Sequence, residues 1–395
     1  MDFVKKTLGD LTVGKGQYGI GASAVDYSED LYTYLRITDI NDDGTLNVNN
    51  LKSINDKNAE RYLLQPNDIV FARTGNSTGR NYFYDGTDGI LVYAGFLIKF
   101  SIDSSKVNPK YIKYYCMSDE YKGWVQGHLT GSTRGNINAQ TYANMEISIP
   151  PREQQNRIVS ILEELERKRK NNIAINRNLY EQAVALFEAM YQGYPVKKIG
   201  ELDIFVTDYV ANGSFASLKE NVTILEEKNY AYFVRNVDLK AKEFPRFVNQ
   251  HSYEFLSKSK LVGGEVIISN VGDVGSVFLC PKLDGPMTLG NNMIMLTSPK
   301  HNNYLYLFFK SYIGQGKIGG ITGGSAQPKF NKTDFKSLEI NYPDESQVDK
   351  FNEKTSALLD MISKLDEENK QLTALRDSLL PKLMSGELDV SDLDI

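Results

Sequence analysis

Apolar residues follow two different periods along this chain, and the two patterns alternate twice. Residues 1–150 and 196–343 contain short runs rich in β-branched and aromatic residues, such as DIVFAR, ILVYAGFLIKF and EVIISNVG, separated by Gly and Asn turns. A longer segment in which apolar residues recur every seven positions follows each of these stretches. The pattern predicts an α+β chain with two globular domains of mixed short strands and helices, each followed by one long helix.

The first long segment, residues 151–195, carries the signals of a helix. It follows Pro150 and Pro151, which suit a first turn, and we expect the helix to end before Gly193. Its seven-residue ladder consists of Ile158, Leu165, Asn172, Leu179 and Leu186. We expect Asn172, opposite a leucine-rich partner, to fix the register of a helix pair at some cost in stability.

The second long segment, residues 344–395, repeats this plan. Asp344 is the expected N-cap with Gln347 three residues later, Gly386 is the expected end, and Pro381 should kink the last turn. The ladder, shifted by 193 residues from the first, consists of Phe351, Leu358, Leu365, Leu372 and Leu379. Two amphipathic helices that each pack on their own domain are one interpretation, but five heptads in register favour an antiparallel coiled coil.

The globular stretches also repeat each other. Five pairs of similar segments occur in the same order, among them VKKTLGDL with VKKIGEL, PNDIVFARTGNSTG with GGEVIISNVGDVG, and NPKYIKYY with NNYLYLFF. The last of these pairs predicts short aromatic helices at 109–118 and 303–313. Because the order is preserved, we interpret the chain as two divergent copies of one domain-plus-helix unit.

Two arginines lie at matching places in the copies. YLRITDI aligns with FVRNVDL, so that Arg36 matches Arg235 and Asp39 matches Asp238. Each arginine alternates with apolar residues in a predicted strand. A salt bridge within the framework and a contact with a phosphate are both open interpretations at this point.

The order domain, helix, domain, helix has a geometric consequence. If the helices pair antiparallel, the two domains lie at opposite ends of a rod, roughly 50–60 Å apart. Two similar but non-identical domains on one rod suit a ligand with two different halves, such as two half-sites on one face of DNA about one helical turn, roughly 34 Å, apart.

Three pairs of matching loops differ between the copies and are rich in Asn, Gln, Ser, Thr, Arg and Gly, whose side chains can address base edges and phosphates. Ordinary turns are the alternative interpretation of each loop. The candidate DNA-contacting residues in the first domain are Gln17, Tyr18, Arg73, Thr74, Asn76, Ser77, Arg80, Ser132 and Arg134. In the second domain they are Asn212, Ser214, Phe215, Ser269, Asn270, Ser325, Gln327 and Lys329.

Charge and composition narrow the function classes. The formal charge is −5, and residues 344–395 alone, with 6 basic and 13 acidic side chains, account for −7, so the globular parts are near neutral. Such domains attract phosphate weakly, and DNA binding would rest on local loops or on partners. The sequence has no apolar run of membrane-spanning length, no signal-peptide pattern and only two distant cysteines, which favours a cytoplasmic chain without membrane contact.

Catalytic motifs are missing from the pattern. GNSTGRN lacks the lysine of a phosphate-binding loop, NPKY opens a predicted helix instead of forming an adenine-clamping tetrad, and the three histidines share no metal-ligand spacing. The acidic run YPDESQVDK lies at a helix start, where carboxylates are favoured by the helix dipole. We therefore expect no catalytic residue, no metal site and no cofactor bound by this chain.

The sequence resembles the specificity subunit of type I restriction–modification enzymes. The resemblance covers the whole chain and rests on the tandem copies, the strands LRITDI and VRNVDL, the turn NDIVFARTGNSTG, the helix start IPPREQQNRIVSIL and the ending DSLLPKLMSGEL. It implies target recognition domains at 1–150 and 196–343, with conserved-region helices at 151–195 and 344–395 as an antiparallel spacer.

The resemblance also implies a function and partners. Each domain would read one half of a bipartite, asymmetric site in double-stranded DNA, and the spacer would dock two methyltransferase (modification) subunits. Those subunits methylate adenine with S-adenosylmethionine, and restriction (motor) subunits that use ATP and Mg²⁺ join them. Two alternatives stay open: a coiled-coil scaffold whose repeated heads bind proteins or glycans, and a specificity subunit of a different bipartite methyltransferase–nuclease system.

Overall fold

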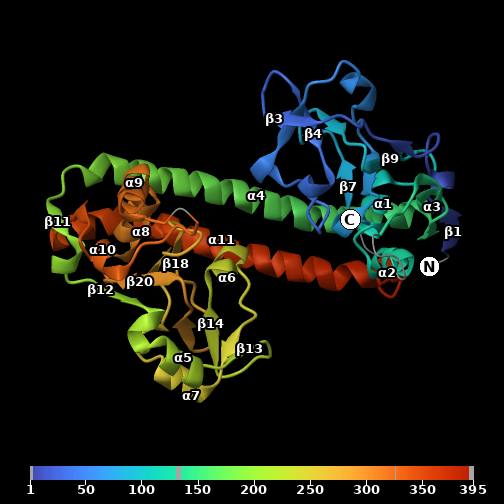
Figure 1. Cartoon of the computed structure of the whole chain (residues 1–395). Coiled ribbons are helices and arrows are strands. Elements are labelled where there is room, and N and C mark those ends of the chain that lie inside the picture. Colours follow the sequence, from blue (N-terminus) through green and yellow to red (C-terminus); the bar gives the residue numbers. More distant parts are fainter. Residues whose placement is uncertain (1–2, 130–134, 325, 391–395) are drawn as a thin grey trace. The chain divides into compact units, whose positions relative to one another are not determined.

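The computed structural model describes residues 3–129, 135–324 and 326–390. In the following, residues 3–150 are called the first head and residues 196–343 the second head. None of the described helices is long and apolar enough to cross a membrane. The prediction of an α+β chain with two mixed domains and two long helices is confirmed (Figure 1).

The chain divides into two compact units, and each unit combines segments that are distant in the sequence. Unit 1 joins residues 1–171 to residues 368–395, and unit 2 consists of residues 172–367. The long helices α4 (Arg152–Tyr191) and α11 (Glu345–Ser385) each contribute one part to each unit. Each unit therefore consists of one head and a pair of helix segments.

The first head contains two four-stranded sheets and a short two-stranded ribbon. The first sheet has the order β2-β9-β6-β7 and is antiparallel throughout; the second has the order β3-β5-β4-β8, with β4 and β8 parallel. Its strands are β1 (Val4–Thr7), β2 (Gln17–Tyr18), β3 (Ala24–Asp26), β4 (Tyr32–Leu35), β5 (Lys52–Ile54), β6 (Asp68–Ala72), β7 (Asn81–Tyr84), β8 (Leu91–Tyr93), β9 (Leu97–Ser101) and β10 (Glu146–Ile149). Its helices are α1 (Pro109–Tyr115), α2 (Asp119–Leu129) and α3 (Ala139–Ala143).

The second head repeats this topology and adds one strand, β16, at the edge of its second sheet. Its sheets have the orders β12-β20-β17-β18 and β13-β15-β14-β19-β16, and β14 and β19 are again parallel. Its strands are β11 (Val196–Lys198), β12 (Phe205–Asp208), β13 (Ile224–Leu225), β14 (Ala231–Val234), β15 (Phe247–Val248), β16 (Lys260–Leu261), β17 (Val266–Ser269), β18 (Val277–Leu279), β19 (Met287–Leu289), β20 (Met293–Thr297) and β21 (Glu339–Asn341). Its helices are α5 (Phe215–Asn221), α6 (Asn236–Ala241), α7 (Gln250–Phe255), α8 (Asn302–Lys310), α9 (Tyr312–Ile321) and α10 (Lys332–Lys336). The predicted internal repeat is therefore visible in the fold itself.

Aromatic helix faces fill the core of each head. Tyr111, Tyr114 and Tyr115 of α1 are buried in one cluster with residues of β6, β9 and the start of α4. In unit 2, Tyr304 and Phe308 of α8 occupy the corresponding place. The tyrosine spacing in α1 thus marks a packed helix face, as its i, i+3, i+4 pattern indicates.

The predicted ends of the long helices agree with the structure. Asp344 accepts a hydrogen bond from the Gln347 amide (2.8 Å), and the Gln347 side chain accepts one from the Asp344 amide (2.9 Å). This reciprocal pair is a capping box. Gly386, with φ of 75°, ends α11 in a left-handed conformation that suits glycine. A kink at Pro381, which lies inside α11, stays a prediction.

Contacts between α4 and α11 occur within each unit. In unit 1, Lys168 of α4 forms an ion pair with Glu368 of α11 (2.5 Å), and an Arg157 nitrogen donates to the carbonyl of Val390 in the segment after α11 (2.9 Å), so the partner number falls as the α4 number rises. This order is that of an antiparallel pair. In unit 2, the Asn176 amide donates to Asp366 (3.0 Å). A knobs-into-holes seam over the whole length stays a prediction.

The ladder residues do not all face the packed side. Ile158, Asn172 and Phe351 are buried, whereas Leu165, Leu179, Leu186, Leu358, Leu365, Leu372 and Leu379 are only half-buried. At the far end of each helix the residue directly after the ladder position is buried instead, Phe187 in α4 and Leu380 in α11. A straight helix drifts about 20° per heptad, so after four heptads the buried face moves by almost one residue. The predicted ladder residues Leu186 and Leu379 are therefore replaced at these ends by Phe187 and Leu380 as the buried positions.

Candidate nucleic-acid interface

Three segments of the first head meet around Arg73, the residue after β6. The Arg73 amide donates to the Phe96 carbonyl oxygen (3.0 Å), and the Arg73 carbonyl accepts from the Ile137 amide (2.9 Å). The guanidinium carbon lies 4.9 Å from the centroid of the Tyr18 ring, which is a cation–π contact. The Tyr18 hydroxyl accepts a hydrogen bond from the Ala139 amide (3.2 Å). The loop after β6, the strand β2 and the segment before α3 therefore meet at one place.

Asn270 occupies the same place in the second head, directly after β17. Its amide donates to the Asn292 carbonyl oxygen (3.1 Å), and its carbonyl accepts from the Phe330 amide (3.0 Å). These two backbone hydrogen bonds repeat those of Arg73. We call this pair of bonds the backbone clamp. Because it uses only backbone atoms, it fixes the loop at the same place in both heads whatever side chain is attached.

The clamped side chains keep unused hydrogen-bonding capacity. Arg73 Nε is buried and has no hydrogen-bond partner among the described residues, and the same holds for Asn270 Oδ1. A buried polar group without a partner is costly, and a site for a ligand is one reason to retain it. The first head offers a donor at this place and the second head an acceptor, so matching positions present opposite hydrogen-bonding groups.

Comparison with known proteins shows the family to which the chain belongs. The family model described as "Type I restriction modification DNA specificity domain" matches residues 2–180 and again residues 194–375. The chain belongs to this family. The double match coincides with the internal repeat, and family membership confirms the prediction of a non-catalytic DNA-recognition chain.

Relatives of similar length share this assignment. The chain is similar to the type I restriction enzyme HindI specificity subunit of Haemophilus influenzae, with 21% identity that covers 94% of this chain and 99% of that protein. It is also similar to the type I restriction enzyme MjaIX specificity subunit of Methanocaldococcus jannaschii, with 20% identity and coverage of 74% and 72%. Its fold is similar to the crystal structure of a type I restriction–modification S subunit from M. genitalium, with a TM-score of 0.57, 16% identity and coverage of 97% and 96%.

In the first head, the residues predicted to contact DNA differ in their solvent exposure. Gln17, Tyr18 and Asn76 are exposed, and Arg73, Thr74, Ser77 and Arg80 are half-buried. Thr74 forms a β-bridge with Asn136 beside the backbone clamp. Ser132 and Arg134 lie outside the described residues. Whether any of these side chains contacts DNA stays a prediction.

In the second head, the candidates fall into an exposed and an internal group. Ser214, Phe215, Gln327 and Lys329 are exposed, Asn212 and Asn270 are half-buried, and Ser325 lies outside the described residues. Ser269 is fully buried, and its hydroxyl points to the Asn292 carbonyl, so it supports the loop from inside. The Asn212 amide is used internally as well, because it bonds to Tyr209, Lys258 and Ser259.

The two matched arginines are part of the framework. Arg36 donates from Nε and Nη2 to the two carboxylate oxygens of Asp39 (2.9 and 2.6 Å), and Arg235 does the same to Asp238 with the same distances. Hydrogen bonding to Asp39 raises the pKa of Arg36 above its ordinary value. Of the two interpretations left open by the sequence, this geometry favours the salt bridge.

Arg80 also pairs with an acid in the structure. Its Nε donates to Asp42 (2.7 Å) and its Nη1 to the Ile40 carbonyl (3.1 Å). Asp42 is largely exposed, so this surface pair is weak, and a phosphate could replace it. The contact with DNA predicted for Arg80 therefore requires that the ion pair opens.

One loop at the interface was missed by the sequence reasoning. The run ILVYAGFLIKF, which the sequence analysis treats as one strand-like run, is divided by a turn at residues 94–96 into β8 and β9. The signal was present, since Gly95 interrupts an otherwise apolar β-branched run. The turn places Phe96 next to Arg73, and Asn292 is its counterpart next to Asn270.

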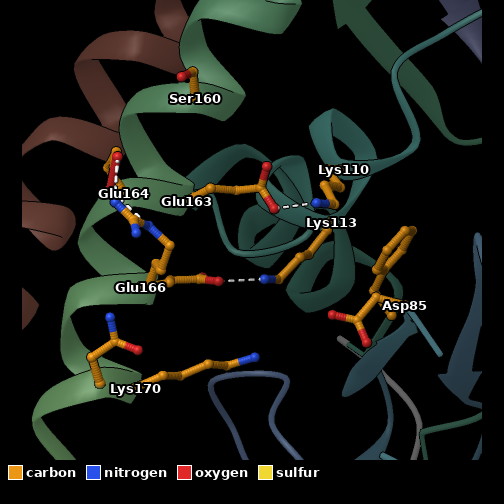
Figure 2. A pocket seen from close by; sticks show the side chains of 11 residues that line it. Asp85, Lys110, Lys113, Ser160, Glu163, Glu164, Glu166 and Lys170 are labelled. Atoms are coloured by element: carbon orange, nitrogen blue, oxygen red, sulfur yellow. Dashed lines mark hydrogen bonds and ion pairs between the residues drawn. The ribbon is translucent and has the colours of Figure 1, made fainter. Parts of the chain in front are cut away.

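A cavity of about 420 Å³ in unit 1 lies between α1 and α4 and is lined mainly by charged side chains (Figure 2). Lys110 pairs with Glu163, and Lys113 with Glu166, across the junction between head and helix. Because acids and bases neutralise each other here, we interpret the cavity as part of this junction. Among the described residues, no group of three or more His, Cys, Asp or Glu side chains could hold a metal ion.

The junction of the second head has the same geometry but a different chemistry. At the positions that match Lys110 and Glu163, Asn303 donates to Ser356 (3.1 Å). At the positions that match Lys113 and Glu166, the second copy has Tyr306 and Leu359, which belong to one apolar cluster. At these matched positions the first junction is thus ionic and the second neutral, although Lys300 and Lys242 of the second head pair with Glu345 and Asp366 of α11 elsewhere.

Proposed function

We propose that each head reads one half of a bipartite, asymmetric DNA site for a type I restriction–modification complex. The observation that carries this proposal is the backbone clamp, which holds Arg73 and Asn270 at equivalent places in the two heads. An asymmetric site requires two domains that share a backbone arrangement but present different side chains, because base edges are distinguished by their donor and acceptor pattern.

The side chains at the clamp support DNA as the ligand. Arginine and asparagine are the residues that pair in bidentate fashion with guanine and adenine edges, respectively. Lys329 and Gln327 are exposed in the loop that bridges to Val271 beside Asn270, and they suit contacts with phosphate and sugar. The near-neutral charge of the heads implies that partner subunits supply much of the phosphate attraction.

The long helices are proposed to dock two modification subunits. In unit 2, Ile173 and Ile175 of α4 and Met361 of α11 expose 51%, 46% and 45% of their surface. Apolar side chains of this size on a charged helix pair favour a protein partner. S-adenosylmethionine, ATP and Mg²⁺ would then bind to the partner chains, which carry the methylation and restriction chemistry.

The proposal is tested by methylation mapping. The chain is co-expressed with a modification subunit encoded beside it, and modified adenines are mapped genome-wide by single-molecule sequencing. We expect a two-part motif with a fixed gap and one modified adenine on each strand. Replacing residues 1–150 with those of a relative should change one half only. A stable complex that leaves no motif would contradict base reading and support the scaffold alternative.

A further inference from the structure

We infer that a fourth loop in each head reads the half-site: the turn at residues 94–96 through Phe96 and the turn at residues 290–292 through Asn292. The expected ligands are the 5-methyl group of a thymine for Phe96 and the hydrogen-bonding edge of an adenine for Asn292. This inference rests on the proposed function, because it assigns two further specificity-determining residues to the same DNA interface.

The turn is fixed against the residues of the interface. In the first head, the Ala94 amide donates to the Leu35 carbonyl (2.9 Å), and the Phe96 carbonyl accepts a hydrogen bond from the Arg73 amide (3.0 Å). In the second head, the Gly290 amide donates to the Val234 carbonyl (2.7 Å), and the Asn292 carbonyl accepts the Asn270 amide (3.1 Å). Residues 96 and 292 therefore lie at the same place, each as one half of a backbone clamp.

Phe96 presents an apolar surface where the core does not use it. Its side chain is 60% exposed, although neighbouring Leu97 is fully buried in the sheet. Tyr18, which is 42% exposed and carries the Arg73 guanidinium over its ring, belongs to the same interface. An exposed phenyl group beside an arginine suits the major-groove edge of DNA, where thymine alone among the four bases carries a methyl group.

Asn292 presents a free amide at the matching place. Its backbone adopts φ of 63°, a left-handed conformation that asparagine tolerates better than most residues. The side chain is exposed and forms no hydrogen bond among the described residues. An asparagine amide can donate to N7 and accept from N6 of adenine at the same time. The two heads therefore carry apolar readout and hydrogen-bond readout on one backbone frame.

Base analogues that each lack a single functional group test the two contacts separately. The assembled methyltransferase complex is assayed for initial methylation rate on duplexes that carry its mapped motif. Thymines in the first half-site are replaced one at a time by deoxyuridine, which removes only the methyl group. Adenines in the second half-site, except the methylated one, are replaced by 7-deazaadenine, which removes only N7.

We expect one thymine whose conversion to deoxyuridine slows the wild-type complex about fourfold, the effect of one buried methyl group. Phe96→Asn should abolish this difference, and Phe96→Ala should do the same. One adenine should show an effect of about fivefold with 7-deazaadenine, as for a lost hydrogen bond, and Asn292→Ala should abolish it. Val48→Ala, which truncates a side chain that is 67% exposed in the first head, should retain both effects.

The outcomes separate this inference from the proposed function. Loss of the analogue effect in the Phe96 and Asn292 variants, but not in Val48→Ala, supports it. A motif in the wild type with analogue effects that persist in Phe96→Asn and Asn292→Ala overturns it, and so does a first half-site without thymine, while the proposed function stands. A wild-type complex that produces no bipartite motif contradicts the proposed function itself.

Discussion

Removal of the Arg36 side chain tests whether the matched arginines serve the framework or the DNA. Asp39 is the buried partner, with 4% of its side chain exposed, and it accepts three hydrogen bonds from Arg36: from Nε, from Nη2 and from the backbone amide. Arg36→Ala removes two of these bonds and leaves a buried carboxylate without its countercharge. The substitution also removes the hydrogen bond from Arg36 Nη2 to the Asn50 carbonyl (2.9 Å).

The expected cost follows from this geometry. Breaking a fully buried ion pair costs about 3–5 kcal/mol, and a hydrogen bond to a charged group contributes about 1.5–3 kcal/mol. The Arg36 side chain is 24% exposed, so water can partly replace it, and we expect about 2–3 kcal/mol. Arg235→Ala should cost slightly less, since the hydrogen bonds that Arg235 donates to the described residues all go to Asp238 and none of them matches the Asn50 bond of Arg36.

Hydrogen exchange followed by mass spectrometry measures this cost locally. The full chain has two units, so one global unfolding free energy is not well defined. Loss of about 2–3 kcal/mol should accelerate exchange in residues 36–54 by about 30- to 160-fold. Arg61→Ala, at an exposed position of the same head, is the control and should change little. Unchanged protection together with lost methylation in Arg36→Ala would refute the framework role and restore the phosphate contact.

Three further perturbations address packing, charge and pH. Phe187→Ala removes a buried ring that contacts Tyr304 (5.6 Å between centroids), and we expect calorimetry to show a loss of about 3–5 kcal/mol in the unit 2 transition. Lys113→Ala opens the ionic junction, with an expected loss of about 1 kcal/mol that becomes smaller at 1 M salt in the same measurement. Burial lowers the pKa of His301 from its usual 6.5, so protonation favours the unfolded chain and stability should fall as the pH drops below about 6.5. His301→Asn should flatten that pH dependence in thermal unfolding, and an unchanged slope would contradict the assignment.

The sequence predicts those features that depend on local chemistry. Proline and the Asp344–Gln347 pair mark the helix starts, because capping involves residues only three positions apart. The repeat order predicts that the two heads share one topology. Contacts with the DNA cannot be derived in this way. By pattern Ser269 belongs to a candidate loop and Phe96 to a strand-like run, yet Ser269 is buried and Phe96 is 60% exposed.

The missed elements depend on tertiary packing. The expected helix at 303–313 ends at Lys310, and a second helix, α9, follows despite its glycines. At Gly314 a Cβ atom would lie 2.0 Å from the Phe308 carbonyl oxygen, so the tight junction requires glycine although glycine weakens a helix. The close approach of α8 explains why position 314 holds glycine. This approach is a tertiary contact that a single sequence does not reveal.

The backbone clamp gives a physical reason why the two heads can differ in specificity without differing in fold. At residues 73 and 270 the bonds to the turn and to the segment before α3 or α10 involve amides and carbonyls alone. A new side chain therefore changes the chemistry at the interface but not the path of the loop. The same holds for residues 96 and 292. Exchanging both side chains between the heads, as Arg73→Asn with Phe96→Asn, should hence shift the base preference of the first head toward that of the second and leave the strand pairing intact.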